Sequence, residues 1–590
     1  MRDSINIPSS KRQNLILLFV CVIALVFFKG VSGYLKTFDR AHISSDVTEY
    51  YSFVPAAFEC KDLSFEHGCP QLFWPLTTPD GHHVNKRSIG MAYMYVPFYG
   101  ISQLISSING ENDDGYSKRT QSILVIGMWI YVCIGLFFLG KALFRFFSHA
   151  VVISTLFLLI ATTNLVWYTN GEPLFTHGVN FMWLSILIYF TIAYHDRQKL
   201  ISILIIAFSI SMLALIRPVN LLLGVFPFIY GVHSKETLGS KIQLLRNNWK
   251  HILLAAVIFI LPAIPQFIYW KYATGNWIFY SYLNEIFFWG RPLILDVLFS
   301  FRKGWLIYTP VMLLAMLGFW SLWREAKPIF FPVLIIFPVF LYVISCWWAW
   351  SYGGCYGMRP MIDIYPLLAF SIASLLHKKK WWLATPMALF IILCTILNLF
   401  QAWQYSNGII HYDQMNFKTY KAIWRKIHYP PDYKMLISYP DYSKEVTGNG
   451  SYYSLKEITE MESSIKFIDA GFLCSTDGTH TGVKANHKHA SNCDAFKIRY
   501  NSSKDKFTVQ SSETKFYCRV DASTNFVFID EVNILNASLF SIKSLGDNKF
   551  YFITEDGKYL IATENNQFIL KAEGEVLTSN SYVVIRKYMR

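Results

Sequence analysis

Long apolar runs recur along the chain up to about residue 400 and then stop. Each is close to the roughly 20 residues that an α-helix needs to cross a bilayer. Charged residues make up 16% of the chain, against about 25% in soluble domains. These features predict a polytopic α-helical membrane protein with about eleven transmembrane helices. We expect the spans at residues 14–34, 121–140, 150–168, 177–194, 200–216, 218–233, 251–270, 305–323, 329–346, 362–376 and 382–400. The short pair around Arg217 is either two kinked spans or one re-entrant hairpin.

The positions of Lys and Arg predict the orientation, because cytoplasmic loops carry an excess of both. With alternating spans, every basic cluster falls on the same side; the clusters are residues 11–12, 141–145, 197–199, 235–250, 324–327 and 378–380. We therefore expect a cytoplasmic N-terminus, with the segment 35–120 and everything after residue 400 outside. The net charge of +14 is attributed to these clusters and to a site that binds anionic phosphates, and no nucleic-acid partner is expected. The first run lacks a small-x-small cleavage site, which predicts a retained signal anchor.

The chain divides into three regions by composition. Residues 1–400 form the predicted membrane domain, residues 401–464 a polar linker with short helices, and residues 465–590 a region of short strands and turns. This last region contains an internal repeat, in which Phe496, Phe507, Tyr517 and Phe526 align with Phe540, Phe550, Tyr559 and Phe568. A weaker copy precedes them, so that Cys474 aligns with Cys518. Three copies of about forty residues, each with about four strands, predict an all-β trefoil.

An acidic motif follows the first apolar run. In "SSDVTEYY", Asp46 and Glu49 lie beside Tyr50 near the expected external membrane surface. One interpretation is a solvated acidic face on an interfacial helix. The other is a carboxylate at an active site that faces a lipid-borne substrate.

Several cations are predicted at the same membrane depth and on the same side as Asp46. Charged groups at span ends usually have a partner. Because few acids lie near them in the sequence, the pattern favours an anionic ligand such as a phosphate or pyrophosphate. Any single one of these side chains could instead extend to the lipid headgroups. The cations are Lys86 with its neighbour Arg87, Arg217, Lys303 beside Arg302, and Arg359.

Other residues in the external segments are candidates with simpler alternatives. Asn85 precedes the Lys86-Arg87 pair and, with Tyr50, is a candidate substrate contact. Glu172 and His177, in "NGEPLFTH", are further candidates, but Glu172 also suits a helix cap and His177 an interfacial histidine. Cys60 and Cys69 could form a disulfide in an oxidising compartment. The sequence shows no His/Cys cluster at metal spacing, no Gly-rich phosphate loop and no nucleophile elbow, so neither metal nor cofactor is expected.

The order of the external motifs resembles a known family. The chain reads "SSDVTEYY", "NKRSIGMAYMYVPFYG", "RPVN", "RKGWLIYTPV" and then "WWAWSYGGCYGMRPMIDIYPLL". Over residues 10–400 this resembles the multi-spanning type C glycosyltransferases, such as protein O-mannosyltransferases and lipid A aminoarabinose transferases. Family members typically read Asn-Lys-Tyr-Pro-Ile-Gly where this chain has "NKRSIG". The motif "DGKYLIATENNQFILKAEG" resembles fascin-like and ricin-like trefoils.

The resemblance implies transfer of a sugar from a polyprenyl-phosphate donor at the outer face of a bacterial inner membrane. It implies that Asp46 lies at the reaction centre, with Glu49 as the second acid of the loop. It also implies that Lys86, Arg217 and Arg359 bind the carrier phosphate. Asp46 would act as general base in an inverting displacement, and the cations would stabilise the leaving phosphate. The sugar would be transferred to a hydroxyl or to a lipid or glycan phosphate, and the acceptor molecule could be a protein, a lipid or a polysaccharide.

Two other functions are compatible with parts of the sequence. A transporter or flippase of lipid-linked sugars would also place cations in a cavity, but transporters usually contain internal repeats and midplane charges, and the spans show neither. A binding protein that acts through its β-domain would need only one anchoring helix. The trefoil is either a carbohydrate-binding module or a structural cap.

Overall fold

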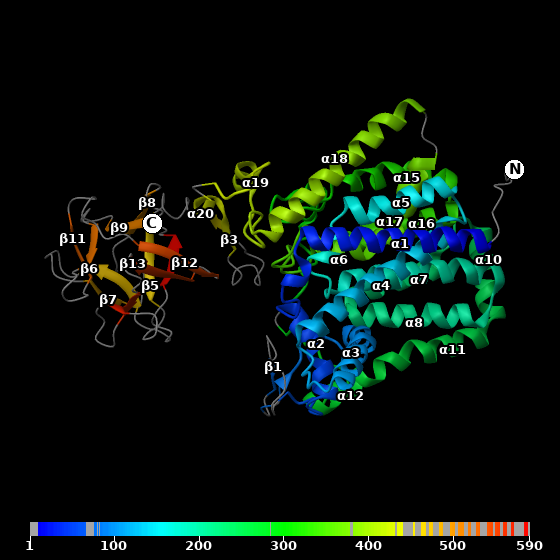
Figure 1. Ribbon diagram of the computed structural model, residues 1–590, viewed down its shortest axis with the longest axis horizontal. Coiled ribbons are helices and arrows are strands. Elements are labelled where there is room, and N and C mark those ends of the chain that lie inside the picture. The colour runs from blue at the N-terminus through cyan, green and yellow to red at the C-terminus, as the bar shows by residue number, and fades with distance from the viewer. Residues whose placement is uncertain are drawn as a thin grey trace. The chain divides into compact units, whose positions relative to one another are not determined.

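The computed structural model describes residues 10–65, 76–78, 81, 83–283, 285–377, 381–430 and 433–440, and beyond these the backbone of strands β4 to β16. The chain forms two compact units, Met1–Gly408 and Ile409–Arg590. The first is built of helices and the second mainly of strands (Figure 1).

The first unit contains eighteen described α-helices, joined in places by 3-10 turns. In chain order they are α1 (Ser10–Tyr34), α2 (Asp46–Phe58), α3 (Gly90–Asn109), α4 (Lys118–Leu143), α5 (His149–Thr162), α6 (Leu165–Asn170), α7 (Thr176–Arg197), α8 (Leu200–Ile216), α9 (Phe226–Ile229), α10 (Lys235–Asn247), α11 (Trp249–Ile260), α12 (Ile264–Thr274), α13 (Ile294–Phe299), α14 (Trp305–Tyr308), α15 (Leu313–Glu325), α16 (Lys327–Ser345), α17 (Tyr365–His377) and α18 (Trp381–Ser406). The 3-10 helices η2 (Pro218–Val225) and η5 (Arg359–Ile364) precede α9 and α17, and a two-stranded ribbon pairs β1 (Leu76–Thr77) with β2 (His83–Val84).

Seven helical segments of the described chain are long and apolar enough to cross a membrane. They are Lys11–Tyr34, Lys118–Leu143, Thr176–Arg197, Trp249–Thr274, Lys327–Ser345, Arg359–His377 and Ala384–Ser406. Three shorter apolar segments, His149–Thr162, Leu200–Ile216 and Pro218–Ile229, accompany them. The protein is therefore a polytopic helical protein, as predicted, but the expected count of about eleven full-length spans is not reproduced.

Four expected spans fall short: the one at 200–216 is the continuous but short helix α8, and the other three are interrupted in the backbone. The run at 150–168 breaks where α5 ends, since Thr163 is extended with φ −117° and ψ 165°. The run at 305–323 is divided at Pro310, which opens a 3-10 turn between α14 and α15. The run at 218–233 starts as the 3-10 helix η2 after Pro218. Proline lacks the amide donor that a continuing helix needs, and hydropathy does not register that loss.

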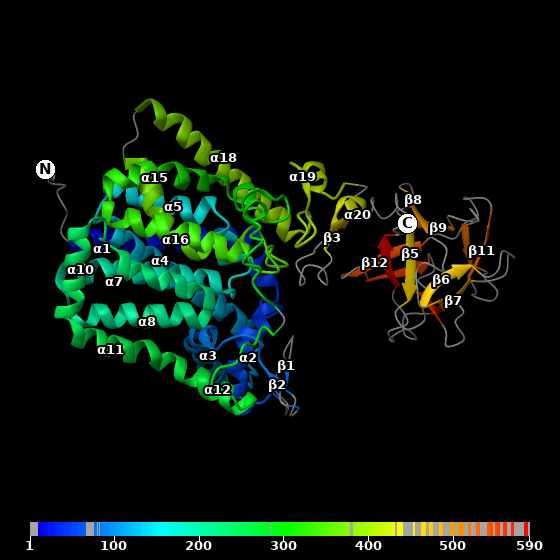
Figure 2. The same ribbon diagram turned by 180° about the vertical axis from the view of Figure 1, so that it is seen from behind.

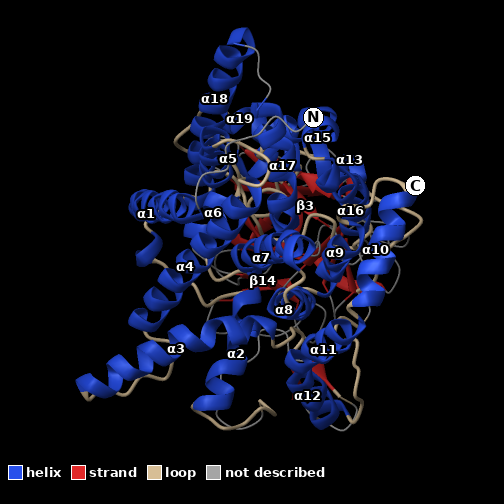
Figure 3. Ribbon diagram, turned by 90° about the vertical axis from the view of Figure 1, so that its right-hand side faces the viewer, coloured by secondary structure: helices blue, strands red, loops and turns tan. Residues whose placement is uncertain are grey.

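The helices pack side by side into a bundle with α7 near its centre, between α4, α8 and α17 (Figure 3). Most residues of α7 and α17 are buried, whereas few residues of α11 and of the described part of α18 are. The start of α1 and the basic helix α10 lie at one end of the bundle, and α2, α6 and β1 lie at the other (Figures 1 and 2). The start of α1 and the basic segment 235–250 thus share an end, in line with the predicted sidedness. Which end faces the cytoplasm stays a prediction.

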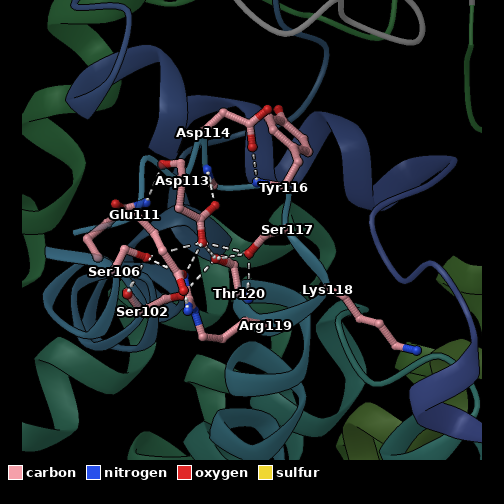
Figure 4. A network of polar contacts seen from close by, with 12 residues as sticks. Ser102, Ser106, Glu111, Asp113, Asp114, Tyr116, Ser117, Lys118, Arg119 and Thr120 are labelled. Carbon is pink, nitrogen blue, oxygen red and sulfur yellow. Dashed lines mark hydrogen bonds and ion pairs between the residues drawn. The ribbon is translucent and has the colours of Figure 1, made fainter. Parts of the chain in front are cut away.

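A network of polar side chains fastens α2, α3 and α4 together at that second end (Figure 4). Asp113 is its centre and accepts hydrogen bonds from the Ser117 hydroxyl at 2.6 Å and the Thr120 hydroxyl at 2.8 Å. The Ser117 hydroxyl in turn accepts from the Thr120 amide and caps α4. Tyr51 of α2 donates its hydroxyl to the carbonyl of Gly115 at 2.7 Å. The turn before α4 therefore also fixes α2.

The second unit begins with α19 (Phe417–Ile423), α20 (Tyr433–Leu436) and the pair β3 (Ser438–Pro440) and β4 (Tyr452–Ser454). Twelve antiparallel strands follow: β5 (Glu462–Phe467), β6 (Gly471–Ser475), β7 (Val483–His487), β8 (Phe496–Asn501), β9 (Lys506–Ser511), β10 (Tyr517–Val520), β11 (Val527–Glu531), β12 (Phe540–Gly546), β13 (Lys549–Thr554), β14 (Tyr559–Ala562), β15 (Phe568–Lys571) and β16 (Val583–Lys587).

Six of these strands pair in a closed cycle. Strand β5 pairs with β8, β8 with β9, β9 with β12, β12 with β13, β13 with β16, and β16 with β5 again. The other six form three hairpins, β6–β7, β10–β11 and β14–β15. The repeat aligned in the sequence places β8 on β12, β9 on β13 and β10 on β14, each within a residue of the same strand position.

The close contact between α15 and α17 generates a testable prediction. A Cβ added at Gly318 would lie 2.0 Å from the carbonyl oxygen of Ser371. Gly318→Ala should therefore force the two helices apart and lower the free energy of unfolding by about 1–3 kcal/mol. Gly239→Ala in α10 is the control, since nothing lies within 4 Å of its added Cβ, and it should raise that free energy by up to about 1 kcal/mol. Thermal unfolding of the detergent-purified protein measures both, and equal melting temperatures for the two variants would contradict the packing described.

Candidate functional site

Asp46 is the first residue of α2 and lies between two arginines. Its Oδ1 accepts Nη2 of Arg87 at 2.7 Å, and its Oδ2 accepts Nη2 of Arg359 at 3.1 Å. The preceding residue, Ser45, has φ 52° and ψ −134°, which is costly for a residue with a Cβ. A carboxylate at a helix N-terminus is favoured by the helix dipole. The strained turn and the two ion pairs together fix the position of Asp46.

Arg87 is held by aromatic and amide groups as well as by Asp46. Its Nη1 donates to the hydroxyl of Tyr282 at 3.1 Å. Its guanidinium lies 5.4 Å from the ring centre of Tyr50 and 5.7 Å from that of Tyr282, within the range of a cation–π interaction. The Arg87 amide donates to Oδ1 of buried Asn85, whose Nδ2 donates to the carbonyl of Glu49 at 2.8 Å. The candidate substrate contacts Tyr50 and Asn85 and the second predicted acid, Glu49, thus form one cluster with Arg87.

The two predicted lysines have different surroundings. Lys86 forms an ion pair with Glu285, and its ammonium lies 5.3 Å from the Tyr282 ring centre. Lys303 is buried, donates to the carbonyl of Cys355, and lies 5.9 Å from the ring centre of Tyr405.

A second carboxylate, which the sequence analysis missed, organises the remaining cation. Asp363 of η5 is fully buried. Its Oδ1 contacts Nδ1 of His177 at 2.8 Å, and its Oδ2 accepts Nη1 of Arg217 at 3.0 Å. Asn220 and Asn180 also donate to Oδ2, at 2.9 and 3.2 Å. The available signal was an acidic residue inside an apolar run, since ionisable groups within spans are rare and usually functional.

Tyr352 connects the two carboxylate clusters. Its carbonyl oxygen accepts Nη2 of Arg359 at 2.9 Å, and its ring centre lies 5.6 Å from the guanidinium of Arg217. Tyr352 adopts φ 58°, a left-handed conformation that a residue with a Cβ rarely takes. It lies in the "SYGGCYG" loop, and the sequence analysis did not single it out.

The electrostatics of the first cluster keep Asp46 ionised. Burial alone would raise the pKa of Asp46, but the charges of Arg87 and Arg359 outweigh burial, so its pKa lies below the ordinary 3.8. Burial raises the pKa of Tyr50 to about 12. Burial also raises the pKa of Glu172, an effect only partly offset by Trp167, Arg359 and Lys303. Glu172 therefore belongs to the electrostatic surroundings of Arg359 and Asp46.

The structure corrects one premise of the sequence analysis. Cations with few acidic neighbours were expected, yet Arg87 and Arg359 pair with Asp46, Lys86 pairs with Glu285, and Arg217 pairs with Asp363. The acids come from distant segments, so nearness in sequence does not identify them.

Two further expectations concern cysteines and metals. Cys60 is disulfide-bonded, but Cys69, its expected partner, lies outside the described residues, so this pairing stays a prediction. Within the described residues no group of three or more His, Cys, Asp or Glu side chains could hold a metal ion.

Comparisons with known proteins find similarity among solved structures. No protein-family model matches the chain, and no curated protein matches its sequence. Among solved structures, the crystal structure of the Archaeoglobus fulgidus oligosaccharyltransferase in the apo form is similar, with a TM-score of 0.36 and 12% sequence identity. The match covers 70% of this chain and 58% of that one. A likeness of this size does not identify a shared fold or activity.

The ion pairs of Asp46 predict how stability depends on pH. Its pKa is lower in the folded chain than in the unfolded chain, so its ionised form stabilises the fold above pH 3.8, and this contribution is lost as the pH falls through the folded pKa. Asp46→Asn should lower the free energy of unfolding by about 3–5 kcal/mol at neutral pH, because it leaves two largely buried arginines without their carboxylate partner. The gap in melting temperature between wild type and variant should stay constant above about pH 5 and narrow below the ordinary pKa.

Asp114→Asn is the control for this titration. Asp114 is exposed and accepts only the amide of Tyr116 within its own turn. Its variant should melt like the wild type throughout. A gap for Asp46→Asn that widens toward low pH would contradict the pairing.

Proposed function

We propose that the protein is a membrane glycosyltransferase that takes a sugar from a polyprenyl-phosphate donor and transfers it to an acceptor hydroxyl. The observation that carries this proposal is the ionised carboxylate of Asp46, clamped between Arg87 and Arg359 at one end of an apolar helix bundle. The proposed reaction needs a base that accepts a proton and cations that bind a phosphate. Asp46 and the two arginines place these groups side by side. The motif order described above supports the same chemistry.

The proposed reaction is a direct displacement at the anomeric carbon. The acceptor oxygen forms a new bond to that carbon, and the bond from the carbon to the phosphate oxygen breaks. The phosphate leaves with the electron pair, and Asp46 takes the proton of the acceptor hydroxyl as general base. Because no covalent intermediate forms on the protein, the anomeric centre is inverted.

Cationic groups are available to the leaving phosphate. Arg359 uses Nη2 for Asp46 and Tyr352, and among the described residues no hydrogen bond reaches its Nε or Nη1. Preorganised donors of this kind stabilise charge as it develops in the transition state. Lys86 and Lys303 add positive charge, and Glu172 and His177 are the proposed contacts of the sugar or acceptor.

We also propose that the second unit contains a β-trefoil in residues 465–590. The closed cycle of six paired strands, the three additional hairpins and the threefold sequence repeat support this assignment. A carbohydrate-binding trefoil would hold a glycan acceptor, whereas a structural trefoil would only cap the unit. We place this unit and the Asp46 site outside an inner membrane, on the basis of the distribution of basic residues.

Transfer by Asp46→Asn tests the proposal. Membranes with the wild type or the variant receive a series of radiolabelled polyprenyl-phosphate sugars, and the product is normalised to folded protein. Asp46→Asn should lower the transfer rate by at least about a hundredfold, the lower bound for loss of a general base. Asp114→Asn makes the same chemical change at an exposed turn and should retain full transfer.

Two results would contradict the proposal in different ways. Full transfer by Asp46→Asn would exclude the assigned role of this carboxylate. Movement of the labelled carrier across the membrane by the wild type, without release of sugar from any donor, would favour a transporter of lipid-linked sugars instead.

A further inference from the structure

Asp363 is a buried charge for which the reaction proposed above has no use. It belongs to the apolar segment Arg359–His377 and has no exposed surface. Its partners come from two other segments: His177 and Asn180 begin α7, and Arg217 and Asn220 lie at the junction of α8 and η2. A buried carboxylate is costly unless it is paired. Such an arrangement needs a reason beyond packing.

Arg217 is held by one nitrogen only. Its Nη1 donates to Asp363, while 15% of its side chain remains exposed. In the part of the chain that the structure describes, no hydrogen bond reaches its Nε or Nη2. A guanidinium has five N–H donors in a rigid, planar arrangement. A single hydrogen bond to Asp363 therefore orients Arg217 and leaves its other donors available. The ring of Tyr352 on one side further restricts its movement.

Arg87 is used differently. Both of its terminal nitrogens are engaged, one with Tyr282 and one with Asp46. Arg87 is therefore bound at both ends of its guanidinium, and its Nε is buried. Arg217 is bound at one end only and lies beside Tyr352, which also contacts Arg359.

We propose that Asp363 is a positioning residue that holds Arg217 by Nη1 so that its remaining donors can bind the phosphate of the donor. This inference rests on the proposed function, and it adds a role for a residue that does not touch the substrate. Asn180 and Asn220 donate to the same carboxylate oxygen but are neutral, so neither supplies a cation that competes with Arg217. Loss of Asp363 should therefore act on phosphate affinity through Arg217.

The experiment measures binding of farnesyl phosphate to the full chain in detergent, with farnesol as the probe that lacks the phosphate. The dissociation constant of farnesol divided by that of farnesyl phosphate isolates the contribution of the phosphate to binding. Arg217→Gln and Asp363→Asn should each reduce this ratio about tenfold, since a charge-assisted hydrogen bond contributes on this scale. The double variant should lose no more than either single variant, because both changes remove the same interaction.

Asn180→Ala is the matched control. It removes another donor to Oδ2 of Asp363 and leaves the Arg217 pair in place. Its ratio should stay within about twofold of the wild type. If Asn180→Ala and Asp363→Asn reduced the ratio equally, the role of Asp363 would be purely structural, and the inference would be overturned.

The double variant keeps the test decisive if Asp363→Asn alone does not fold. It removes both charges and leaves no uncompensated ion in the interior. The inference requires that it bind like Arg217→Gln; a further loss of phosphate affinity would overturn it. If the wild type binds farnesol as tightly as farnesyl phosphate, the proposed use of a phosphate-linked donor is wrong. Phosphate preference in the wild type that Asp363→Asn fully retains would overturn only the positioning role.

Discussion

The double ion pair of Asp46 is the interaction on which the candidate site depends. Its partners, Arg87 and Arg359, are 41 and 313 residues away in the sequence. Charges at the end of an apolar bundle are tolerated only when they pair or reach water. Pairing here joins α2, the segment before α3 and the start of η5 at a single carboxylate. Any change that moves one of these segments changes the charge balance at the other two.

The second carboxylate extends the same principle deeper into the bundle. Asp363 joins α7, the α8–η2 junction and η5, and Tyr352 bridges the two clusters with its carbonyl and its ring. The site therefore consists of two anchored acids with arginines between them. Strained backbone at Ser45 and Tyr352 lies directly beside these arginines, where functional sites commonly store strain.

The sequence was sufficient for features that depend on local composition. Apolar runs identified the helical unit, the repeat identified the strand-rich unit, and the acid and cations of the external motifs were selected before their contacts were known. The partners could not be predicted, because Glu285 and Asp363 meet their cations only when segments distant in the sequence come together in the fold. Hydropathy likewise measures side-chain transfer and not backbone continuity, so the breaks at Thr163 and Pro310 were missed.

The closed strand cycle of the second unit has a consequence for how the protein is made. Strand β16 pairs with β5, so the cycle joins nearly the last residues of the chain to the first strand of the repeat. During synthesis, β5 has no partner on that side until residue 587 has left the ribosome. Its exposed edge could pair with another chain in the meantime. Closure of the cycle therefore waits for β16, and nascent chains that stop short of β16 keep an unpaired edge through which they can aggregate.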